Sequence, residues 1–365
     1  MAGKWKNIGM ALVAAVWLGL AVFAWLRPPD AVSVQERREL AQFPEISEEN
    51  LQNGKFMTDF ESYTLDQFPL RNAFRRLKAG VHYGVLRQKD NNGIYLTQGH
   101  AAQLEYPLNE ASVQRALSIF SGIRDKYLAD SRVLISIVPD KGYYLARDKG
   151  YPAMDYDVLF KKMAGLNGAS YVNLTDLLSA DDYYRTDTHW RQERLLKVAG
   201  RLCGALGIPA PEVEELSTVA AAEPFYGVYY GQAALPMEPD TLYMLRSDIL
   251  DGCRVYNHET GKYGSIYDTA KLAGDDLYEV FLSGSVSLLT IENPAAETDR
   301  ELIVFRDSFG SSIAPLLVQG YRSVTLVDIR YLSPSMLGRF IDFHGQDVLF
   351  LYSTLVLNNA QSLQS

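Results

Sequence analysis

The sequence predicts an α/β fold built on a mostly parallel sheet. Residues 133–138 form an almost unbroken aliphatic run that ends at Pro139, a pattern typical of a strand buried on both faces. Three similar runs occur late in the chain, at residues 302–305, 324–327 and 348–352. Helix-like segments near residues 313–318 and 336–343 separate them. Strands that alternate with helices need crossover connections, so these strands are expected to run parallel in one sheet.

Other elements are expected ahead of and between these strands. A helix is predicted from residue 56, where Phe60 and Tyr63 begin a helical spacing, and another across residues 113–127. Residues 94–96 form a short strand after the turn signal Asp90–Gly93, and residues 171–174 form another. Apolar residues at helical spacing predict a helix that begins near Leu195: Leu195, Val198, Ala199, Leu202, Cys203 and Leu206.

Residues 211–294 interrupt the alternation, because they are rich in Gly, Tyr and Pro. Residues 255–263 indicate a hairpin that turns at residues 258–261. We therefore expect a β-rich insertion between the two halves of the sheet. Tyr229 and Tyr230 within it could line a glycan-binding groove, or could pack on an edge strand.

The N-terminus carries a segment long enough to cross a membrane. Residues 8–26 contain no charge, and at about 1.5 Å per helical residue they span roughly 28 Å. No Ala-x-Ala cleavage site lies near Ala24, so an uncleaved anchor is favoured over a secretory signal. The expected organisation is a cytoplasmic tail (1–7), a single transmembrane helix (8–26), a stalk (27–55) and an extracytoplasmic domain (56–365). Both readings of the segment export that domain.

Composition excludes some classes of function. The 365 residues carry a net charge of −9, whereas nucleic-acid binding needs a basic surface, so no nucleic-acid partner is expected. The two cysteines, Cys203 and Cys253, are no disulfide framework, although they could pair in an oxidising compartment. No Cys/His spacing resembles a metal site, and no cofactor is expected.

The residues Asp187-Thr188-His189-Trp190 are a candidate half of a catalytic site. The chain has only five histidines, and here one lies two positions after a carboxylate. A carboxylate can fix the tautomer of an imidazole and stabilise its protonated form, which a general base in acyl transfer requires. The alternative is that Asp187 or Thr188 caps the helix that follows, with the His-Trp pair packed nearby.

The residues Arg306-Asp307-Ser308-Phe309-Gly310 follow directly after the expected strand 302–305. A serine just past the carboxyl end of a buried parallel strand lies where α/β folds bind ligands. The N–H groups of the next turn could stabilise an oxyanion, and Pro315 fits the following helix only in its first turn. The alternative is a strand-turn-helix in which the serine is a cap.

These two motifs together resemble the DHHW family of SGNH-like acetyltransferases and esterases, which are related to the alginate O-acetylation proteins. Further stretches from Glu36 to Tyr352 resemble its motifs in order and spacing. They are Glu36–Pro44, Asp66–Arg71, Asp90–Tyr95, Val138–Lys141, and Phe281–Gly284 through Ile291–Asn293.

The resemblance implies an SGNH-hydrolase-like three-layer sandwich with a Ser-His-Asp triad. Ser308 would be the nucleophile, His189 the general base and acid, and Asp187 the residue that orients it. Arg306 stands where the wider superfamily has glycine, and it could bind an anionic substrate group or pair with Asp307, which we favour. Lys141 could approach the site, although a solvated lysine is the simpler reading.

The resemblance further implies a membrane-anchored O-acetyltransferase or esterase that acts on a cell-envelope or secreted glycan through an acyl-serine intermediate. A membrane-bound O-acyltransferase partner would supply acetyl groups from across the membrane. A different reading is a catalytically silent envelope protein that binds glycan or scaffolds an assembly, with Tyr229 and Tyr230 as contacts.

Overall fold

The computed structural model describes residues 2–364, and the chain divides into two compact units. One comprises Met1–Asn92 with Gly231–Pro236, and the other comprises Gly93–Tyr230 with Met237–Ser365. Contacts therefore divide the chain after Asn92, and the domain boundary at residue 56 stays a prediction.

The first unit begins with the apolar helix α1 (Ala2–Leu26). Its segment Trp5–Leu26 is long and apolar enough to cross a membrane, as a signal sequence near the N-terminus also would be. The other elements of this unit are β1 (Val32–Ser33), β2 (Arg38–Glu39), α2 (Glu48–Gln52), α3 (Lys55–Asp66), α4 (Arg71–Gly80), the π-helical turn η1 (Val81–Val85) and β3 (Asp90–Asn91).

An ion network joins the two N-terminal motifs of the first unit. Glu36 forms ion pairs with Arg71 at 2.5 Å and with Arg75 at 3.1 Å, while Asp66 forms ion pairs with Arg38 at 2.6 Å and with Arg71 at 3.2 Å. Hydrogen bonds from Arg38 lower the pKa of Asp66 to about 2. These residues therefore bind one segment of the first unit to another.

The second unit contains an eight-stranded sheet in the order β11-β10-β12-β14-β13-β15-β6-β7. The five strands from β14 to β7 are parallel, whereas β12, β10 and β11 add antiparallel pairs at one edge. The α/β fold with a mostly parallel sheet is confirmed. The bounds are β6 (Val133–Val138), β7 (Ala169–Tyr171), β10 (Arg254–Asn257), β11 (Lys262–Gly264), β12 (Leu288–Glu292), β13 (Glu301–Arg306), β14 (Ser323–Val327) and β15 (Asp347–Ser353).

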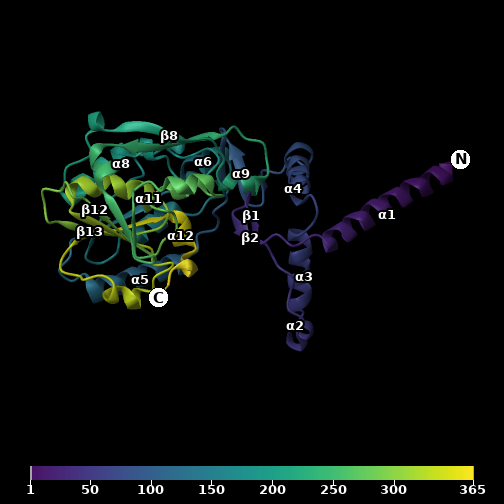
Figure 1. The fold of residues 1–365 in the computed structure, drawn as a ribbon, viewed down its shortest axis with the longest axis horizontal. Helices are drawn as coiled ribbons and strands as arrows, with labels where there is room; N and C mark the ends of the chain where they lie inside the picture. Colours follow the sequence, from purple (N-terminus) through teal and green to yellow (C-terminus); the bar gives the residue numbers. More distant parts are fainter. Residues whose placement is uncertain (1, 365) are drawn as a thin grey trace. The chain divides into compact units, whose positions relative to one another are not determined.

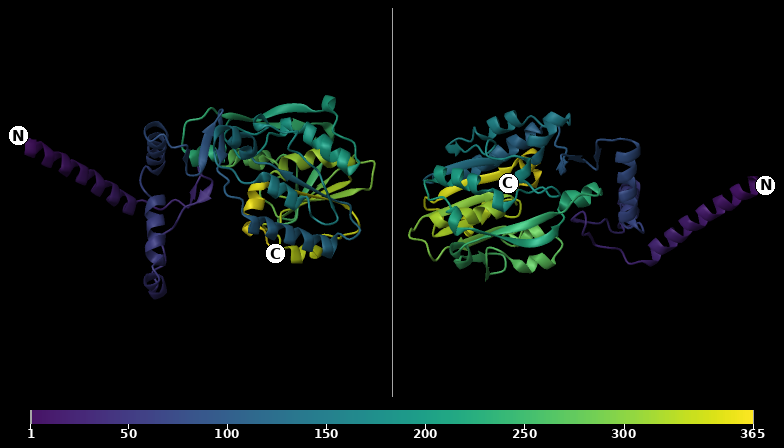
Figure 2. Two further views of the ribbon diagram at one scale, coloured as in Figure 1. Left: turned by 180° about the vertical axis from the view of Figure 1, so that it is seen from behind. Right: turned by 90° about the horizontal axis from the view of Figure 1, so that it is seen from above.

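Alternate side chains of the central strands enter two separate cores. Leu134 of β6 and Leu302 of β13 pack in one core, with α8 (Leu196–Leu206) and α11 (Gly310–Ile313). Ile135 and Ile303 pack in the other, with α5 (Glu110–Tyr127). Figure 1 shows α8 and α11 on one side of the strands and α5 on the other, and the view from behind in Figure 2 shows the same layers. Burial on both faces explains the unbroken aliphatic runs.

Shorter elements connect these layers. Proline begins or nearly begins two of the 3-10 segments, because its missing N–H costs nothing in a first turn. The helix-like segment expected near residues 336–343 forms as the 3-10 turn η8, and the one near residues 313–318 forms as the 3-10 segment η7 after α11. The remaining elements are α6 (Lys141–Lys149), α7 (Tyr156–Met163), η2 (Ala180–Asp182), η3 (Gln192–Arg194), η4 (Val213–Glu215), α9 (Val228–Ala233), α10 (Asp248–Gly252), η5 (Thr269–Ala273), η6 (Leu277–Val280), η7 (Ala314–Gly320), η8 (Pro334–Arg339), α12 (Thr354–Asn358) and η9 (Ala360–Ser362).

The β-rich segment 211–294 is not a separate insertion between two halves of the sheet. The expected hairpin exists as β10 and β11, with Tyr256 opposite Tyr263, but β12 joins it to β14 of the main sheet. Within this segment, β8 (Ser217–Phe225) and β9 (Asp240–Arg246) pair with each other apart from the main sheet. Earlier in the chain, β4 (Ile94–Thr97) pairs with β5 (His100–Gln103). The antiparallel strands therefore extend the same sheet at the β14 edge of its parallel part.

Candidate active site

The structure brings Asp187, His189 and Ser308 together. Nε2 of His189 lies 2.8 Å from Oγ of Ser308, across 119 residues of sequence. Nδ1 of the same ring lies 2.6 Å from Oδ1 of Asp187, which also accepts the backbone N–H of His189 at 3.0 Å. With a carboxylate on Nδ1, the neutral ring presents Nε2 as an acceptor to the serine hydroxyl. The three side chains thus form a continuous hydrogen-bonded relay.

Asp187 does not cap the helix that follows it. Helix α8 begins at Leu196, its N-cap Leu195 makes no side-chain cap, and the 3-10 turn η3 lies between it and the loop. The helix-cap reading is therefore wrong, because both oxygens of Asp187 are engaged within the site.

Aromatic rings fix the plane of the His189 imidazole. The ring of Tyr278, from η6, stacks on it at 3.8 Å with 6° between the planes, and Phe309 lies at 5.1 Å. Tyr278 is held in turn by its hydroxyl, which donates to Oγ of Ser312 at 2.9 Å. Asp187 is fully buried, His189 is 7% exposed and Ser308 is half-buried, so the serine is the member that solvent reaches.

Two backbone groups complete the seat of Asp187. Its Oδ2 accepts the N–H of Val228 at 2.9 Å. The neighbouring Gly227 approaches so closely that a Cβ there would lie 2.2 Å from Cβ of Asp187. A side chain at position 227 would displace the carboxylate, which explains glycine at this position.

Asp240 holds the loop backbone just ahead of the carboxylate. This carboxylate accepts the N–H of Arg185 and the N–H and hydroxyl of Thr186, at 2.6–2.9 Å. The Thr186 hydroxyl also accepts the N–H of Gly227 at 2.9 Å. A segment without regular secondary structure is therefore fixed by side-chain acceptors.

Lys141 is buried, so the solvated reading of this lysine is wrong. It is 2% exposed, and its ammonium donates to the carbonyls of Tyr184 at 2.9 Å and Arg185 at 3.3 Å. Burial lowers its pKa from 10.5 to about 7, against the attraction of Asp187 and Asp240. Lys141 thus binds carbonyl groups of the same loop whose N–H groups donate to Asp240.

Asp307 secures the turn that carries Ser308. Its oxygens accept the N–H of Phe309 at 3.0 Å and that of Ser353, at the end of the neighbouring strand β15, at 2.7 Å. Trp190 links this turn to the histidine loop, because its indole N–H donates to the carbonyl of Phe309 at 3.1 Å and to Oγ of Ser312 at 2.9 Å. Within residues 2–364, no acceptor is found for the backbone N–H of Ser308.

Arg306 is fully buried. It was expected to pair with the Asp307 side chain, and it does not. Its nearest carboxylate is Asp328, at 3.8 Å, and it donates to the carbonyls of Gly284 and Val286 at 3.4 and 3.3 Å. The pairing fails because both oxygens of Asp307 accept backbone N–H groups. A guanidinium without exposed surface has no access to a dissolved substrate, so Arg306 supports the fold.

The two tyrosines expected at a glycan groove differ in burial. Tyr229 is 4% exposed, donates to Oγ1 of Thr188 at 3.0 Å and lies over the ammonium of Lys141 at 5.1 Å. Tyr230 is half-buried and its ring packs on that of Tyr226 at 4.4 Å. Tyr229 therefore supports the loop that carries His189, whereas Tyr230 stays near the surface.

Neither cysteine takes part in this arrangement. Cys203 and Cys253 are both buried and free, and burial raises the pKa of Cys203 to about 12 and of Cys253 to about 11. In the part of the chain that the structure describes, no group of three His, Cys, Asp or Glu side chains could hold a metal ion.

The fold and the site define a class: an α/β protein with a Ser-His-Asp relay at the carboxyl ends of parallel strands. The model of the DHHW protein family matches residues 156–327, a range that contains Asp187, His189 and Ser308. The resemblance to the DHHW family is therefore confirmed.

Two solved structures share this fold, and a third is more distantly similar. A DHHW family protein from Eubacterium siraeum is 22% identical, with a TM-score of 0.61 over 76% of this chain and 97% of that one. PatB1 of Bacillus cereus, in a structure with a sulfonyl adduct, is 14% identical, with a TM-score of 0.58 over 72% and 95%. The O-acetyltransferase domain of Pseudomonas putida AlgJ is 15% identical, with a TM-score of 0.45 over 73% and 92%. The search of curated proteins gave no match.

Sequence reasoning missed three residues of the site: Gly227, Asp240 and Tyr278. Each belongs to the segment that was expected to be an insertion. A glycine between Tyr226 and Val228 carried a weak signal of close backbone approach, whereas an isolated aspartate and tyrosine carried none.

Proposed function

We propose that the protein is an O-acetyltransferase or esterase that transfers an acetyl group through an acyl-serine intermediate. The observation that carries the proposal is the 2.8 Å contact of His189 Nε2 with the Ser308 hydroxyl, with Asp187 at 2.6 Å on the opposite nitrogen. Nucleophile, base and orienting carboxylate at such distances are the signature of covalent acyl transfer.

The reaction follows from these positions. His189 Nε2 takes the proton of Ser308 as Oγ attacks the acetyl carbonyl, and Asp187 stabilises the imidazolium. Collapse of the tetrahedral intermediate breaks the bond to the donor oxygen, which receives the proton from His189. An acceptor hydroxyl then loses its proton to His189 and attacks the acyl-serine, which releases the acetylated product and restores Ser308. Water in place of the acceptor gives hydrolysis.

The unpaired N–H of Ser308 is our candidate for one oxyanion donor. The N–H groups of Phe309 and Gly310 donate to Asp307 and are committed to the turn. A donor that is already fixed on the reacting residue stabilises the developing charge without reorganisation.

The acceptor in this proposal is a glycan of the cell envelope or a secreted glycan. The confirmed family resemblance supports a glycan acceptor, and the partner would be a membrane-bound O-acyltransferase that delivers acetyl groups. Helix α1 would anchor the protein with its domain outside the cytoplasm. Membrane fractions washed at alkaline pH should retain the full chain, whereas release of a chain shortened by about 26 residues would indicate cleavage.

A covalent probe tests the nucleophile. A fluorophosphonate or sulfonyl fluoride reagent should label the wild-type protein on Ser308 and leave Ser308→Ala unlabelled. Ser311→Ala is the matched control, since Ser311 lies only three residues later, in α11, and its hydroxyl is buried. Equal labelling of wild type and Ser308→Ala would overturn the assignment.

Product analysis separates transferase from esterase. Wild-type protein would be incubated with an activated acetyl ester, with and without oligosaccharide, and both acetate and acetylated sugar would be measured. A transferase forms acetylated sugar at the expense of acetate, whereas unchanged acetate release would favour the esterase.

A further inference from the structure

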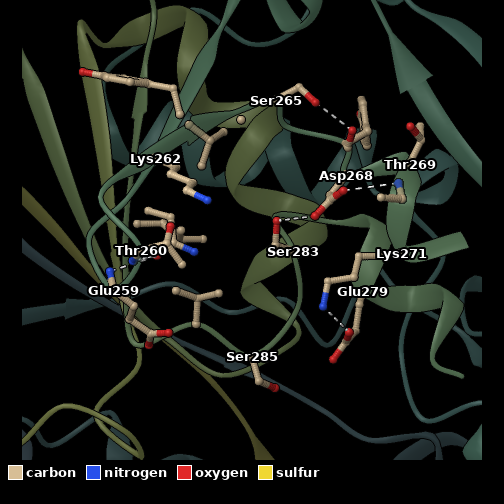
Figure 3. Close-up of a pocket in the computed structure, with 18 residues that line it drawn as sticks. Glu259, Thr260, Lys262, Ser265, Asp268, Thr269, Lys271, Glu279, Ser283 and Ser285 are labelled. Atoms are coloured by element: carbon tan, nitrogen blue, oxygen red, sulfur yellow. Dashed lines mark hydrogen bonds and ion pairs between the residues drawn. The ribbon is translucent and has the colours of Figure 1, made fainter. Parts of the chain in front are cut away.

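A polar cavity lies in the segment that forms the antiparallel edge of the sheet. It has a volume of about 670 Å³ and lies among the β10–β11 hairpin, η5, η6 and residues 283–286 (Figure 3). A cavity of this size holds two or three sugar rings, since ligand sites range over roughly 300–1,000 Å³. No residue of the proposed triad lines it.

The lining offers hydroxyl groups with little free charge. Glu279 is paired with Lys271 at 2.8 Å, Asp268 accepts the Ser283 hydroxyl at 2.9 Å, and Glu259 accepts the N–H of Ser287 at 2.8 Å. The lining carries three acidic and two basic side chains, which disfavours an anionic ligand. Thr260, Thr269 and Ser285 add further hydroxyl groups to the lining.

Tyr263 supplies an aromatic wall. The side chain is 56% exposed although its hydroxyl is fixed on Glu292 at 2.9 Å. Arg254, which does not line the cavity, lies over the ring at 5.0 Å. The ring of Tyr256 also contacts it at 5.0 Å. A tyrosine that is held by these neighbours and by its hydroxyl, yet is more than half exposed, presents a rigid apolar surface, which suits the C–H face of a sugar ring.

Another part of the lining contains a strained segment. Leu282, Ser283 and Gly284 are consecutive and all have positive φ, at 55°, 60° and 80°. A Cβ at Gly284 would lie 2.6 Å from Cγ of Glu279, so glycine is required. Side chains rarely adopt this conformation, which costs about 1 kcal/mol or more per residue and is concentrated at functional sites. Here it directs the Ser283 hydroxyl onto Asp268 at the cavity wall.

The short turn η6 connects the cavity to the catalytic residues. Tyr278 stacks on His189, while the next residue, Glu279, lines the cavity. Tyr267 also lines it and donates to Oε1 of Gln192, three residues after His189. A ligand in the cavity therefore contacts the segment that positions the base.

We propose that this cavity is a carbohydrate-binding site for a neutral oligosaccharide, distinct from the acyl-transfer centre. Its use as a subsite for the glycan acceptor rests on the proposed function, whereas binding itself does not. Hydroxyl donors and acceptors would hold the sugar hydroxyls, and Tyr263 would stack on a ring.

Direct binding tests the site. The full chain in detergent micelles would be titrated calorimetrically with two series of neutral oligosaccharides, of glucose and of N-acetylglucosamine, and with a uronate series of matched length. We expect saturable binding of a neutral series. Tyr263→Ala and the cavity-filling Ser285→Trp should each weaken it about tenfold or more, because a stacking surface or the space itself is lost.

Two control variants keep the result interpretable. Tyr331→Ala removes a comparable ring, 52% exposed and covered by Arg330 at 5.4 Å, and should leave binding unchanged. Ser308→Ala should also retain binding, so failure of the acyl chemistry and failure of this site are distinguishable. No binding of either neutral series, tighter binding of uronates, or equal loss in Tyr331→Ala would overturn the proposal. Thermal unfolding of each variant excludes misfolding as the cause.

Discussion

Two segments carry the proposed triad, and they reach the same point by different means. Ser308 follows β13 directly, and its turn is fixed through Asp307 to the end of the adjacent strand β15. The loop with Asp187 and His189 continues no strand of the sheet, and Lys141 and Asp240 hold its carbonyl and N–H groups from outside. The proposed nucleophile is placed by sheet topology, and the proposed base is placed by tertiary contacts.

The difference indicates where each half is vulnerable. Strand pairing supports Ser308 through many backbone hydrogen bonds. The loss of one contact therefore leaves the others to hold its position. The histidine loop depends on a few buried side chains, and each of them leaves unpaired polar groups when removed. Substitutions in the two segments test this contrast.

The largest effect is expected for His189→Gln. Glutamine cannot accept the proton of Ser308, so turnover of an acetyl ester should fall about 10⁴-fold. The assay is steady-state hydrolysis, with Ser308→Ala as reference. Because the two residues act as a unit, the double variant should be no worse than either single variant, and additive losses would contradict a shared mechanism.

Asp240→Ala and Asp307→Ala compare the two supports directly. Asp240→Ala leaves two N–H groups and a hydroxyl without their acceptor, which should cost about 2–4 kcal/mol of stability and about 10²-fold in turnover. Asp307→Ala should cost similar stability but less turnover, because the strands still hold the turn. Denaturant unfolding and ester hydrolysis measure both. A greater loss of turnover in Asp307→Ala would reverse the comparison.

Lys141 predicts a pH dependence of stability. Its pKa is about 7 in the folded protein and 10.5 ordinarily, so between these values the unfolded chain binds more protons. The Lys141 contribution to the free energy of unfolding therefore rises with pH, by about 2 kcal/mol from pH 7 to pH 9, and is flat below pH 7. Lys141→Met should lack this rise. The measurement is denaturant unfolding at each pH. If the free energy of unfolding changed with pH in the same way in wild type and Lys141→Met, the assignment to Lys141 would be refuted.

The smallest effect is expected for Trp190→Phe. The substitution removes one N–H that joins the two segments, while the ring contact with Phe309 and the Tyr278 hydroxyl on Ser312 remain. A loss of about 1 kcal/mol and less than tenfold in turnover is expected. Tyr278→Phe is the matched variant, because it removes the other hydrogen bond to Ser312 and keeps the stacked ring. A collapse of turnover in Trp190→Phe alone would mean that the link sets the triad geometry.

The sequence by itself determined the parallel core and where the serine lies. Unbroken aliphatic runs are the direct consequence of burial on both faces, and a strand end fixes the position of the residue that follows it. It also determined the apolar N-terminal helix and the pair of motifs that carry the family resemblance.

The tertiary structure alone decided what surrounds the histidine. Gly227, Asp240 and Tyr278 contact a loop 40 to 89 positions before them, and no periodicity encodes such contacts. The burial of Lys141 and Arg306 was equally invisible, because a charged residue after a strand is usually solvated. Local patterns report which face of an element is apolar, whereas the partner of a buried polar group is chosen only when distant segments pack.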